Sequence, residues 1–508
     1  MSFMNAVRQT LNNEYNVSIT ENGAVGYRTT GKELLDLNFA VASLRKMPDA
    51  EVAKRFMKAF YEDQVLAMKW LFYARDVRGG LGERRLFRVV LAELIKSNPE
   101  MVIPVINLMP EYGRYDDLWC LLDDKDAANV IYQIVDNQLK SDWENMAAKK
   151  PISILAKWMP SINASSVKTR EYGKKLCKAL KMTEREYRKA LSKLRAYLDV
   201  VEVKMSDKNW SEIKYEAVPS RANLIYNSAF LRNDEARRRE YLGKLEKGET
   251  KINASTLFSH DIVHTYCNGI RYIKSKDATI EALWKALPDT VKGCGNTIVV
   301  ADGSGSMTTT VDNNSRVTAL EVANALAIYF AEHSSGDFKD KYITFSHNPQ
   351  LVDFSKCKSL HDKLHTALMH NEVADTNIEK VFDLILTTAI NGGMHQEDLP
   401  KNVLIISDME FNSCARCNNG RPNQTLFNTI AKKYARAGYK MPRLVFWNVN
   451  SRTGTIPVKE NELGVALVSG FSVNVAKMVM SGKTDPFECL LETLNSERYT
   501  PVEEALNQ

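Results

Sequence analysis

The first 290 residues carry the hydrophobic spacing of amphipathic helices almost throughout. In residues 181–198 the apolar side chains recur at three- and four-residue steps with basic residues between them: Tyr187, Leu191, Leu194 and Leu198. Thr183 and Glu186 have the spacing of a capping box at the start of that helix. Similar helical stretches lie at residues 51–76 (two helices), 85–96, 127–148 and 232–247. Because amphipathic helices joined by short polar turns stack in pairs, we expect a helical-repeat, HEAT-like array or ring without a strict period.

The pattern changes near residue 290. Short apolar runs are expected to form strands at residues 296–302, 340–346, 402–408, 443–449 and 464–470. Helical stretches alternate with them at residues 317–333, 377–390, 425–437 and 486–496. This alternation predicts a doubly wound α/β domain with a parallel sheet covered on both faces. We therefore divide the chain into a helical domain, 1–290, and an α/β domain, 291–508.

Length and composition agree with a globular protein of more than one domain. The chain has 508 residues, of which 44% are hydrophobic and 26% charged. It has no uninterrupted run of 18 apolar residues, and its first residues lack the pattern of a signal peptide, so we expect no membrane partner. The eight cysteines are mostly scattered, which is typical of reduced thiols and indicates a cytoplasmic protein.

The positive charge of the chain is concentrated in one segment. The net charge is +6, yet residues 151–200 alone contain 12 Lys and Arg against 4 Asp and Glu. A local basic surface of this kind suits a polyanion such as nucleic acid. The alternative is a solvated helix face without a ligand.

A group of polar residues follows two of the expected strands. Asp302, Ser304 and Ser306 form the pattern Asp-x-Ser-x-Ser directly after the first strand, and Asp408 ends a later one. Thr376 lies in a loop immediately before a helix. Few carboxylates together with neutral hydroxyls suit a hard divalent cation, Mg²⁺ or Mn²⁺, in octahedral oxygen coordination. The alternative is that these side chains only cap the following helices.

These residues resemble the metal-ion-dependent adhesion site of von Willebrand factor A domains. The resemblance implies that the five ligand positions of that site correspond to Asp302, Ser304, Ser306, Thr376 and Asp408. It also implies that the bound cation accepts an acidic side chain from a protein partner.

The helical half combined with such a domain is similar to the Ro autoantigen (TROVE) proteins. A poorly characterised Ro-like family of eukaryotes and viruses has recurring phrases that resemble "YARDVRGGLGERRLF" (73–87), "EYGRYDDLW" (111–119), "ILAKWMPSINASS" (154–166) and "LVFWNVN" (444–450). This resemblance spans both halves. It implies a ribonucleoprotein-type function, the binding of structured or misfolded small RNA by the helical domain.

Two basic stretches are the candidate RNA contacts. The first contributes Arg75, Arg78, Arg84 and Arg85 around a glycine-rich turn, and the second contributes Lys168, Arg170, Lys174 and Lys175 beside Tyr172. A guanidinium group can make bidentate hydrogen bonds to two phosphate oxygens, and a tyrosine ring can stack on a base. The alternative for Arg75 and Arg84 is pairing with Asp76, Glu83 or neighbouring helices, which would only lock the turn.

Other candidate chemistry is weaker. Cys414 and Cys417 have the spacing of half a zinc site without a second pair nearby, and the two pairs His260/His264 and His361/His365 lack a third ligand. We therefore expect a protein that is not an enzyme, binds structured RNA and holds Mg²⁺ in its α/β domain. The alternative is a metal-dependent protein-interaction module without nucleic-acid binding. A metal-dependent nuclease is disfavoured because such enzymes cluster more carboxylates around two metals.

Overall fold

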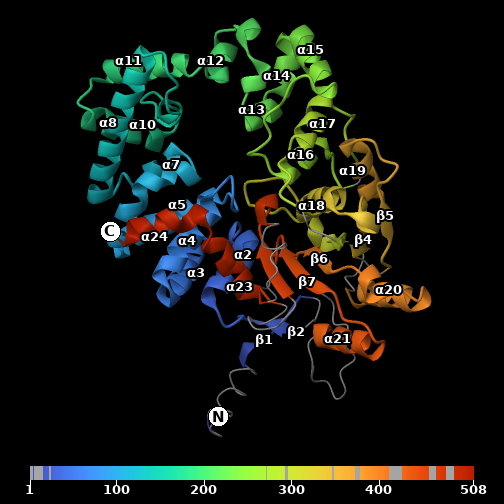
Figure 1. Cartoon of the computed structure of the whole chain (residues 1–508). Coiled ribbons are helices and arrows are strands. Elements are labelled where there is room, and N and C mark those ends of the chain that lie inside the picture. The colour runs from blue at the N-terminus through green and yellow to red at the C-terminus, as the bar shows by residue number, and fades with distance from the viewer. Residues whose placement is uncertain are drawn as a thin grey trace. The chain divides into compact units, whose positions relative to one another are not determined.

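The computed structural model (Figure 1) describes residues 4, 15–21, 25–270, 272–291, 296–345, 348–371, 378–410, 426–452, 454–456, 465–475 and 485–507. The chain forms two compact units. The first, here called the sheet unit, comprises Met1–Glu62 and Leu257–Leu494. The second, the helical unit, comprises Asp63–Thr256 and Asn495–Gln508.

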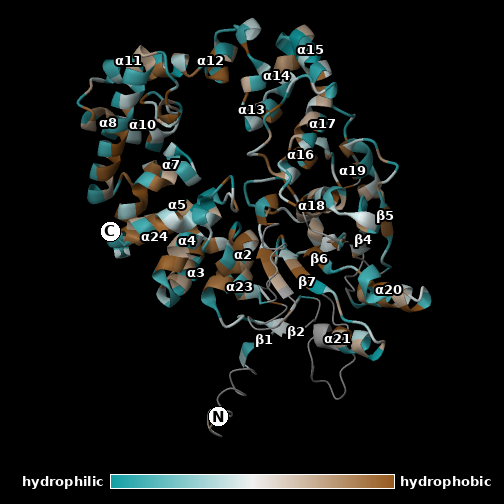
Figure 2. Cartoon of the chain, viewed as in Figure 1, coloured by the Kyte–Doolittle hydropathy of each residue, from teal (hydrophilic) through white to brown (hydrophobic). Residues whose placement is uncertain are grey.

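The sheet unit is built on six strands in the order β5-β4-β3-β6-β7-β8. The strands are β3 (Thr297–Asp302), β4 (Lys341–Phe345), β5 (Leu351–Asp353), β6 (Asn402–Ser407), β7 (Arg443–Asn448) and β8 (Val465–Ser469). All neighbouring pairs are parallel except β4 with β5, which is antiparallel. The central strands β3 and β6 are almost wholly buried, and Figure 2 shows the strands largely in the hydrophobic colour. A sheet buried on both faces explains why these segments appear in the sequence as continuous apolar runs.

The strand order reverses at β3. The chain passes from β3 through α18 (Ala319–His333) to β4, and then crosses to β6 on the other side of β3. Because such crossovers are right-handed, α18 lies on the opposite face from α20 (Ile378–Asn391) and α21 (Leu426–Arg436). Side chains at the carboxyl ends of β3 and β6 therefore lie at the topological switch point, where open α/β sheets bind ligands.

Segments from both ends of the expected helical domain belong to the sheet unit. Helix α2 (Glu33–Leu44) lies against β7 and β8, where the Ala42 amide donates to Ser469 Oγ at 3.1 Å and Asn448 Nδ2 donates to the Phe39 carbonyl at 2.8 Å. Helix α16 (Ser259–Tyr266) packs on α18. The compact units thus group the chain differently from the expected domains 1–290 and 291–508.

Ten further elements within the described ranges belong to the sheet unit. They are β1 (Val17–Ile19), β2 (Val25–Tyr27), α3 (Asp49–Glu62), α17 (Ala278–Lys285), η5 (Gly305–Thr308), η6 (Gly336–Phe338), α19 (Leu360–Met369), η7 (Gln396–Asp398), η9 (Val473–Val475) and α23 (Pro486–Leu494). The strands β1 and β2 pair antiparallel as a separate two-stranded sheet.

The helical unit contains α-helices and 3₁₀ turns, with its last segment supplied by the end of the chain. Its longer helices are α4 (Gln64–Arg75), α5 (Arg84–Ser97), α8 (Lys125–Ala147), α10 (Val167–Ala179), α11 (Glu184–Tyr197) and α15 (Glu235–Glu246). Its shorter helices are α6 (Pro99–Val102), α7 (Met109–Tyr112), α9 (Leu155–Trp158), α12 (Val201–Ser206), α13 (Ser220–Ile225), α14 (Asn227–Asn233) and α24 (Thr500–Leu506). Its 3₁₀ turns are η1 (Ile103–Leu108), η2 (Tyr115–Leu121), η3 (Trp210–Glu212), η4 (Tyr215–Ala217) and η10 (Glu497–Tyr499).

The expected fold class is confirmed at the level of a helical region followed by a mixed sheet with helices. The Thr183–Glu186 capping box opens α11, and Tyr187, Leu191 and Leu194 are buried as the helical spacing predicts. A HEAT-like arrangement of the helices stays a prediction. Among the described residues, none of the helices combines the length and apolar character needed to cross a membrane.

Candidate functional site

The candidate metal centre lies at the carboxyl ends of β3 and β6. Asp302 is the last residue of β3, and Asp408 follows Ser407, the last residue of β6. Both carboxylates are buried. The Ser407 hydroxyl donates to Asp302 Oδ2 at 2.6 Å, and the Ser304 amide donates to Asp302 Oδ1 at 2.9 Å. The two neighbouring strands therefore bring the two predicted aspartates to one point.

The two predicted serines also lie at this centre. Ser304 and Ser306 lie in the short turn after β3, and their hydroxyl oxygens are 3.0 Å apart. On the β6 side, Met409 has a φ of 64°. A bulky residue in the left-handed region is uncommon and marks a sharp turn, here directly after Asp408. Four of the five predicted ligands are thus brought together.

The fifth, Thr376, lies outside the described residues. Asn371 is the last residue described before it, and a β-carbon placed on Gly303 would lie 3.3 Å from Asn371 Oδ1. The segment that leads to Thr376 therefore begins beside the Asp302 turn. Asn371 is buried, and its Nδ2 has no hydrogen-bond partner among the residues that the structure describes.

The charges of this centre are poorly compensated. Burial raises the pKa of Asp302, and the nearby charge of Asp408 raises it further. Burial also raises the pKa of Asp408. Asp408 Oδ2 is buried without a hydrogen-bond donor among the described residues, and its nearest cation is Arg452 Nη2 at 3.7 Å. A buried carboxylate pair without a full counter-charge is costly unless a cation occupies the space between the oxygens.

Asp302, Asp408, Ser304 and Ser306 supply oxygen donors to this centre. Within the described ranges, no cluster of three or more His, Cys, Asp or Glu side chains could hold a metal ion. Cys414 and Cys417 lie outside those ranges. His264 pairs with Glu321, the two Nδ1–Oε distances being 3.1 and 3.0 Å, and His361 Nε2 lies 3.1 Å from the Lys274 carbonyl. The oxygen donors of the Asp302 centre fit Mg²⁺ or Mn²⁺ by their chemistry.

The arginine-rich turn is largely a structural element. Arg75 is buried, and its Nε and Nη2 lie 2.8 and 2.7 Å from Asp117 Oδ2. No exposed guanidinium remains at this position for a phosphate, so Arg75 is withdrawn from the candidate RNA contacts. Arg78 is exposed but donates to the Glu111 carbonyl at 2.9 Å, whereas Arg84 and Arg85 are exposed at the start of α5.

The glycines of this turn pack closely against other residues of the same chain. A β-carbon on Gly80 would lie 1.9 Å from the Tyr73 carbonyl oxygen, so the close approach is used to seat the turn on α4. Asp76 is buried and accepts hydrogen bonds from Arg498 and from the Tyr499 hydroxyl, the latter at 3.1 Å. The turn is therefore locked, as the alternative interpretation held, but by the C-terminal segment of the chain.

The second basic stretch forms α10 and is partly neutralised. Lys168 and Lys175 lie 3.7 and 2.7 Å from Asp123, and Arg170 donates to the carbonyls of Ala164 and Ser165. Lys174 is exposed. Tyr172 is buried below the lysine side chains, which removes it as a stacking platform for a base.

A stronger basic surface lies on α11, here called the α11 basic face. Arg185, Arg188, Lys189 and Lys193 are exposed, and with Ser192 they line a shallow hollow of about 620 Å³. Their spacing of three and four residues places them on one side of the helix. None of the four forms an ion pair with a carboxylate in the part of the chain that is described. The basic content of residues 151–200 signalled this region, but the individual positions were not singled out.

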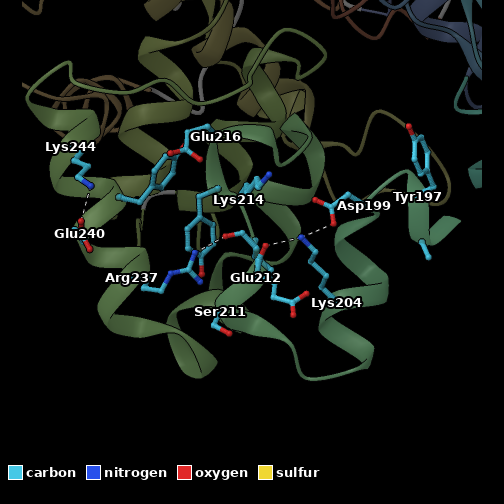
Figure 3. Close-up of a pocket in the computed structure, with 14 residues that line it drawn as sticks. Tyr197, Asp199, Lys204, Ser211, Glu212, Lys214, Glu216, Arg237, Glu240 and Lys244 are labelled. Atoms are coloured by element: carbon cyan, nitrogen blue, oxygen red, sulfur yellow. Dashed lines mark hydrogen bonds and ion pairs between the residues drawn. The ribbon is translucent and has the colours of Figure 1, made fainter. Parts of the chain in front are cut away.

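Another hollow in the helical unit, of about 890 Å³, offers no comparable surface (Figure 3). Three of its cations contact protein acceptors: Lys204 lies 2.6 Å from Asp199 and Lys244 lies 2.7 Å from Glu240, and Arg237 lies 2.9 Å from Asp234. The rings of Tyr215 and Tyr241 stack on each other at 5.4 Å. We therefore assign no ligand to this hollow.

Comparison with known proteins finds similarity to a family model, to a viral protein and, weakly, to a solved structure. The model of a domain of unknown function (DUF7788) matches residues 296–504. An uncharacterised protein of Acanthamoeba polyphaga mimivirus is 28% identical, over 96% of this chain and 89% of that protein. The crystal structure of the Deinococcus radiodurans Ro (RSR) protein has 14% identity and a TM-score of 0.40, over 87% of this chain and 93% of that one. A TM-score of that size carries no inference about fold or function.

A second family model covers the N-terminal part of the chain. It describes a domain of unknown function (DUF2828) and matches residues 20–111 and 129–297, just over half of the chain. On this match, the chain belongs to the DUF2828 family.

Proposed function

We propose that this chain is a non-catalytic binding protein whose sheet unit holds Mg²⁺, or Mn²⁺, at the ends of β3 and β6. Asp302, Asp408, Ser304 and Ser306 would hold the cation, and Thr376, which lies outside the described residues, is the fifth ligand that the sequence predicts. The observation that carries the proposal is the buried Asp302–Asp408 pair, in which Asp408 Oδ2 has no hydrogen-bond donor among the described residues. A divalent cation supplies the counter-charge that this pair needs.

The donor set suits ligand capture better than hydrolysis. Two carboxylates balance the charge of a divalent cation, and together with two or three neutral hydroxyls they leave an octahedral cation with open coordination positions. An acidic side chain of a protein partner would fill one such position, as the resemblance to metal-ion-dependent adhesion sites implies. A hydroxyl-rich site with one cation lacks the second metal that activates water and the leaving group in nucleases.

Equilibrium binding of Mn²⁺, followed by the electron paramagnetic resonance of the free ion, tests this proposal. We expect the full chain to bind one Mn²⁺, and we expect Asp302→Asn and Asp408→Asn to lose that binding. Asp353→Asn serves as the control, because Asp353 is an exposed carboxylate paired in register with Lys341 at the amino end of β4. Equal binding by all four proteins would contradict the proposal.

A second function, binding of structured RNA by the helical unit, is supported by the α11 basic face. Four exposed cations without carboxylate partners in the described part of the chain form a surface that attracts phosphates. Lys174, Arg84 and Arg85 are further exposed candidates from the sequence. The absence of a stacking tyrosine at Tyr172 favours recognition of RNA by shape and charge.

Titration with a structured RNA at several salt concentrations tests this second function. We expect the variant in which Arg185, Arg188, Lys189 and Lys193 are all glutamine to bind less tightly. Its salt dependence should also be flatter, by about 0.7–0.9 in slope for each lost phosphate contact. Arg239→Gln is the control, because Arg239 is exposed in the same unit but pairs with Glu235 at 2.8 Å.

One further variant, assayed for both kinds of binding, separates the two functions. Asp302→Ala should abolish capture of an acidic protein partner and leave RNA affinity nearly unchanged. Salt-insensitive or absent RNA binding by the wild-type chain would contradict the RNA function and leave the metal-dependent interaction module as the remaining proposal.

A further inference from the structure

The β1–β2 hairpin is fastened to a segment that leads to the cation site. Tyr27 and Ile456 exchange two backbone hydrogen bonds of 2.8 Å, and Ser18 Oγ lies 3.0 Å from Thr455 Oγ1. A β-carbon on Gly26 would lie 2.5 Å from Thr455 Cγ2, so only glycine permits this approach. The hairpin therefore has a defined seat on residues 454–456.

One buried carboxylate holds both sides of this junction. Glu410, two residues beyond Asp408, accepts the Glu21 amide at 2.9 Å through Oε2. It accepts the Arg452 amide at 2.9 Å through Oε1. Glu21 follows β1, and Arg452 follows β7, so Glu410 joins these two residues beside the carboxyl end of β6.

The Arg452 guanidinium is shared between two carboxylates. Its Nη2 lies 2.5 Å from Glu21 Oε2 and 3.7 Å from Asp408 Oδ2. About a third of the Arg452 side chain and half of the Glu21 side chain are exposed, whereas the Asp408 side chain is enclosed. Lys46 adds a second positive charge to this region. Burial lowers the pKa of Lys46, and the nearby charge of Arg452 lowers it further.

From this arrangement we infer that Arg452 is the internal competitor of the divalent cation and that Glu21 controls how strongly it competes. The inference rests on the cation site proposed above. Without a divalent ion, Arg452 partly neutralises Asp408. When the ion binds, the guanidinium is repelled and is held by Glu21. Arg452 and Glu21 are therefore positioning residues that set the cation affinity of the site.

Electrostatics explains the direction of each effect. A guanidinium a few ångströms from Asp408 opposes the approach of a second positive charge, and the low dielectric around a buried carboxylate strengthens this opposition. Glu21 offers Arg452 another partner, which makes its withdrawal from Asp408 less costly. Removing the Arg452 charge should therefore tighten cation binding, and removing the Glu21 charge should weaken it.

A double-mutant cycle on the full chain, with the Mn²⁺ dissociation constant as the readout, tests this inference. We expect Arg452→Gln to bind Mn²⁺ at least about tenfold more tightly than the wild type and Glu21→Gln to bind about threefold more weakly. In the Arg452→Gln background, Glu21→Gln should change the affinity by less than about twofold. Arg452→Lys keeps the charge and should stay near the wild type.

Lys341→Gln is the matched control. It removes one positive charge at the amino end of β4, at the edge of the sheet opposite Asp302, where the lysine donates to the Asp337 carbonyl. Its Mn²⁺ affinity should equal that of the wild type. Thermal unfolding without divalent ions adds a second readout, because Arg452→Gln should lower the midpoint and Mn²⁺ should restore it.

Each remaining outcome overturns the inference in a distinguishable way. Binding by the wild type with no gain in Arg452→Gln rejects the competition while the cation site stands. An equal loss on Glu21→Gln in both backgrounds shows that Glu21 acts on the ion without Arg452. Absence of Mn²⁺ binding in every variant rejects the cation site together with the inference.

Discussion

At the scale of single residues, the Asp302 carboxylate is expected to lower the stability of the metal-free protein and to favour cation binding. Its carboxylate is buried close to Asp408, and both pKa values are raised chiefly by burial. It nevertheless keeps two donors, the Ser407 hydroxyl and the Ser304 amide. Residues that bind a charged ligand are commonly unfavourable for the stability of the free protein.

Replacement of Asp302 by asparagine should therefore stabilise the metal-free protein while it removes cation binding. We expect the free energy of unfolding to rise by about 1 kcal/mol in buffer with a chelator, because a buried like-charge interaction is lost. Added Mg²⁺ should stabilise the wild type and leave the variant unchanged. Thermal unfolding with and without Mg²⁺ measures both effects, and a variant less stable than the wild type in chelator would contradict this account.

A second titratable pair, His264 with Glu321, belongs to the frame of the sheet unit. The hydrogen bond to Glu321 raises the pKa of His264. Burial acts to raise the pKa of Glu321, but the hydrogen bonds from His264 and from the Thr318 amide outweigh it and leave that pKa lowered. The pair joins α16 to the first turn of α18.

The pH dependence of stability that this pair confers follows from the raised pKa of His264 and the lowered pKa of Glu321. The contribution of His264 is complete below its unfolded pKa, about 6.5, and is lost as pH rises through its raised folded pKa. The contribution of Glu321 is complete above its unfolded pKa, about 4.3, and is lost as pH falls through its lowered folded pKa. His264→Gln should therefore lower the unfolding midpoint more near about pH 5.5 than near about pH 9. Equal effects at both pH values would contradict this assignment.

At the scale of elements, the end of the chain completes the helical unit. Arg498 Nη2 donates to Asp76 Oδ1 at 2.8 Å, and Lys69 Nζ lies 2.8 Å from Glu503 Oε2. The stacked rings of Tyr112 and Tyr499 lie beside the Asp76 carboxylate, which has no exposed surface. These contacts seat the C-terminal segment on the turn after α4.

Loss of Arg498 should thus destabilise the helical unit. We expect Arg498→Ala to cost about 2–3 kcal/mol, because it leaves the buried Asp76 carboxylate without its main counter-charge. Arg239→Ala removes an exposed i,i+4 pair and should cost less than about 0.5 kcal/mol. Denaturant unfolding measures both, and equal midpoints for the two variants would contradict the role of Arg498.

Local sequence patterns predicted many of the elements correctly. The expected stretch 51–76 forms the two helices α3 and α4, and the expected strand 402–408 is β6. The pattern missed β1, β2 and β5, each of only three residues, because such short strands carry too few positions for a periodic signal. It also missed the partner of Asp76, which lies more than 400 positions away in the sequence.

The candidate site was predictable to the extent that it depends on strand ends. Asp302 and Asp408 were identified because each ends an apolar run, and parallel strands bring such ends together. Arg452, Glu410 and Glu21 were not identified, since their proximity depends on how loops fold back over the sheet edge. Arg75 was assigned wrongly to the surface because its pairing with Asp117 depends on the packing of α4 against the turn η2.

At the scale of the whole molecule, the two compact units do not follow the change in sequence pattern. The α/β pattern begins near residue 290, yet α2, α3, α16 and α17 belong to the sheet unit. Helices that cover a sheet have the same amphipathic spacing as helices that stack on one another, so periodicity cannot assign a helix to a unit. The two proposed functions nevertheless fall on different units, the cation on the sheet unit and RNA on the helical unit.

The central claim is that a divalent cation binds between Asp302 and Asp408, and anomalous scattering from a crystal of the full chain grown with Mn²⁺ tests it most directly. The account predicts one anomalous peak at the ends of β3 and β6. Its oxygen ligands should lie about 2.1 Å away and include the Ser304 and Ser306 hydroxyls. A crystal that contains Mn²⁺ without a peak at this position, or with the ion held by other residues alone, would contradict the claim.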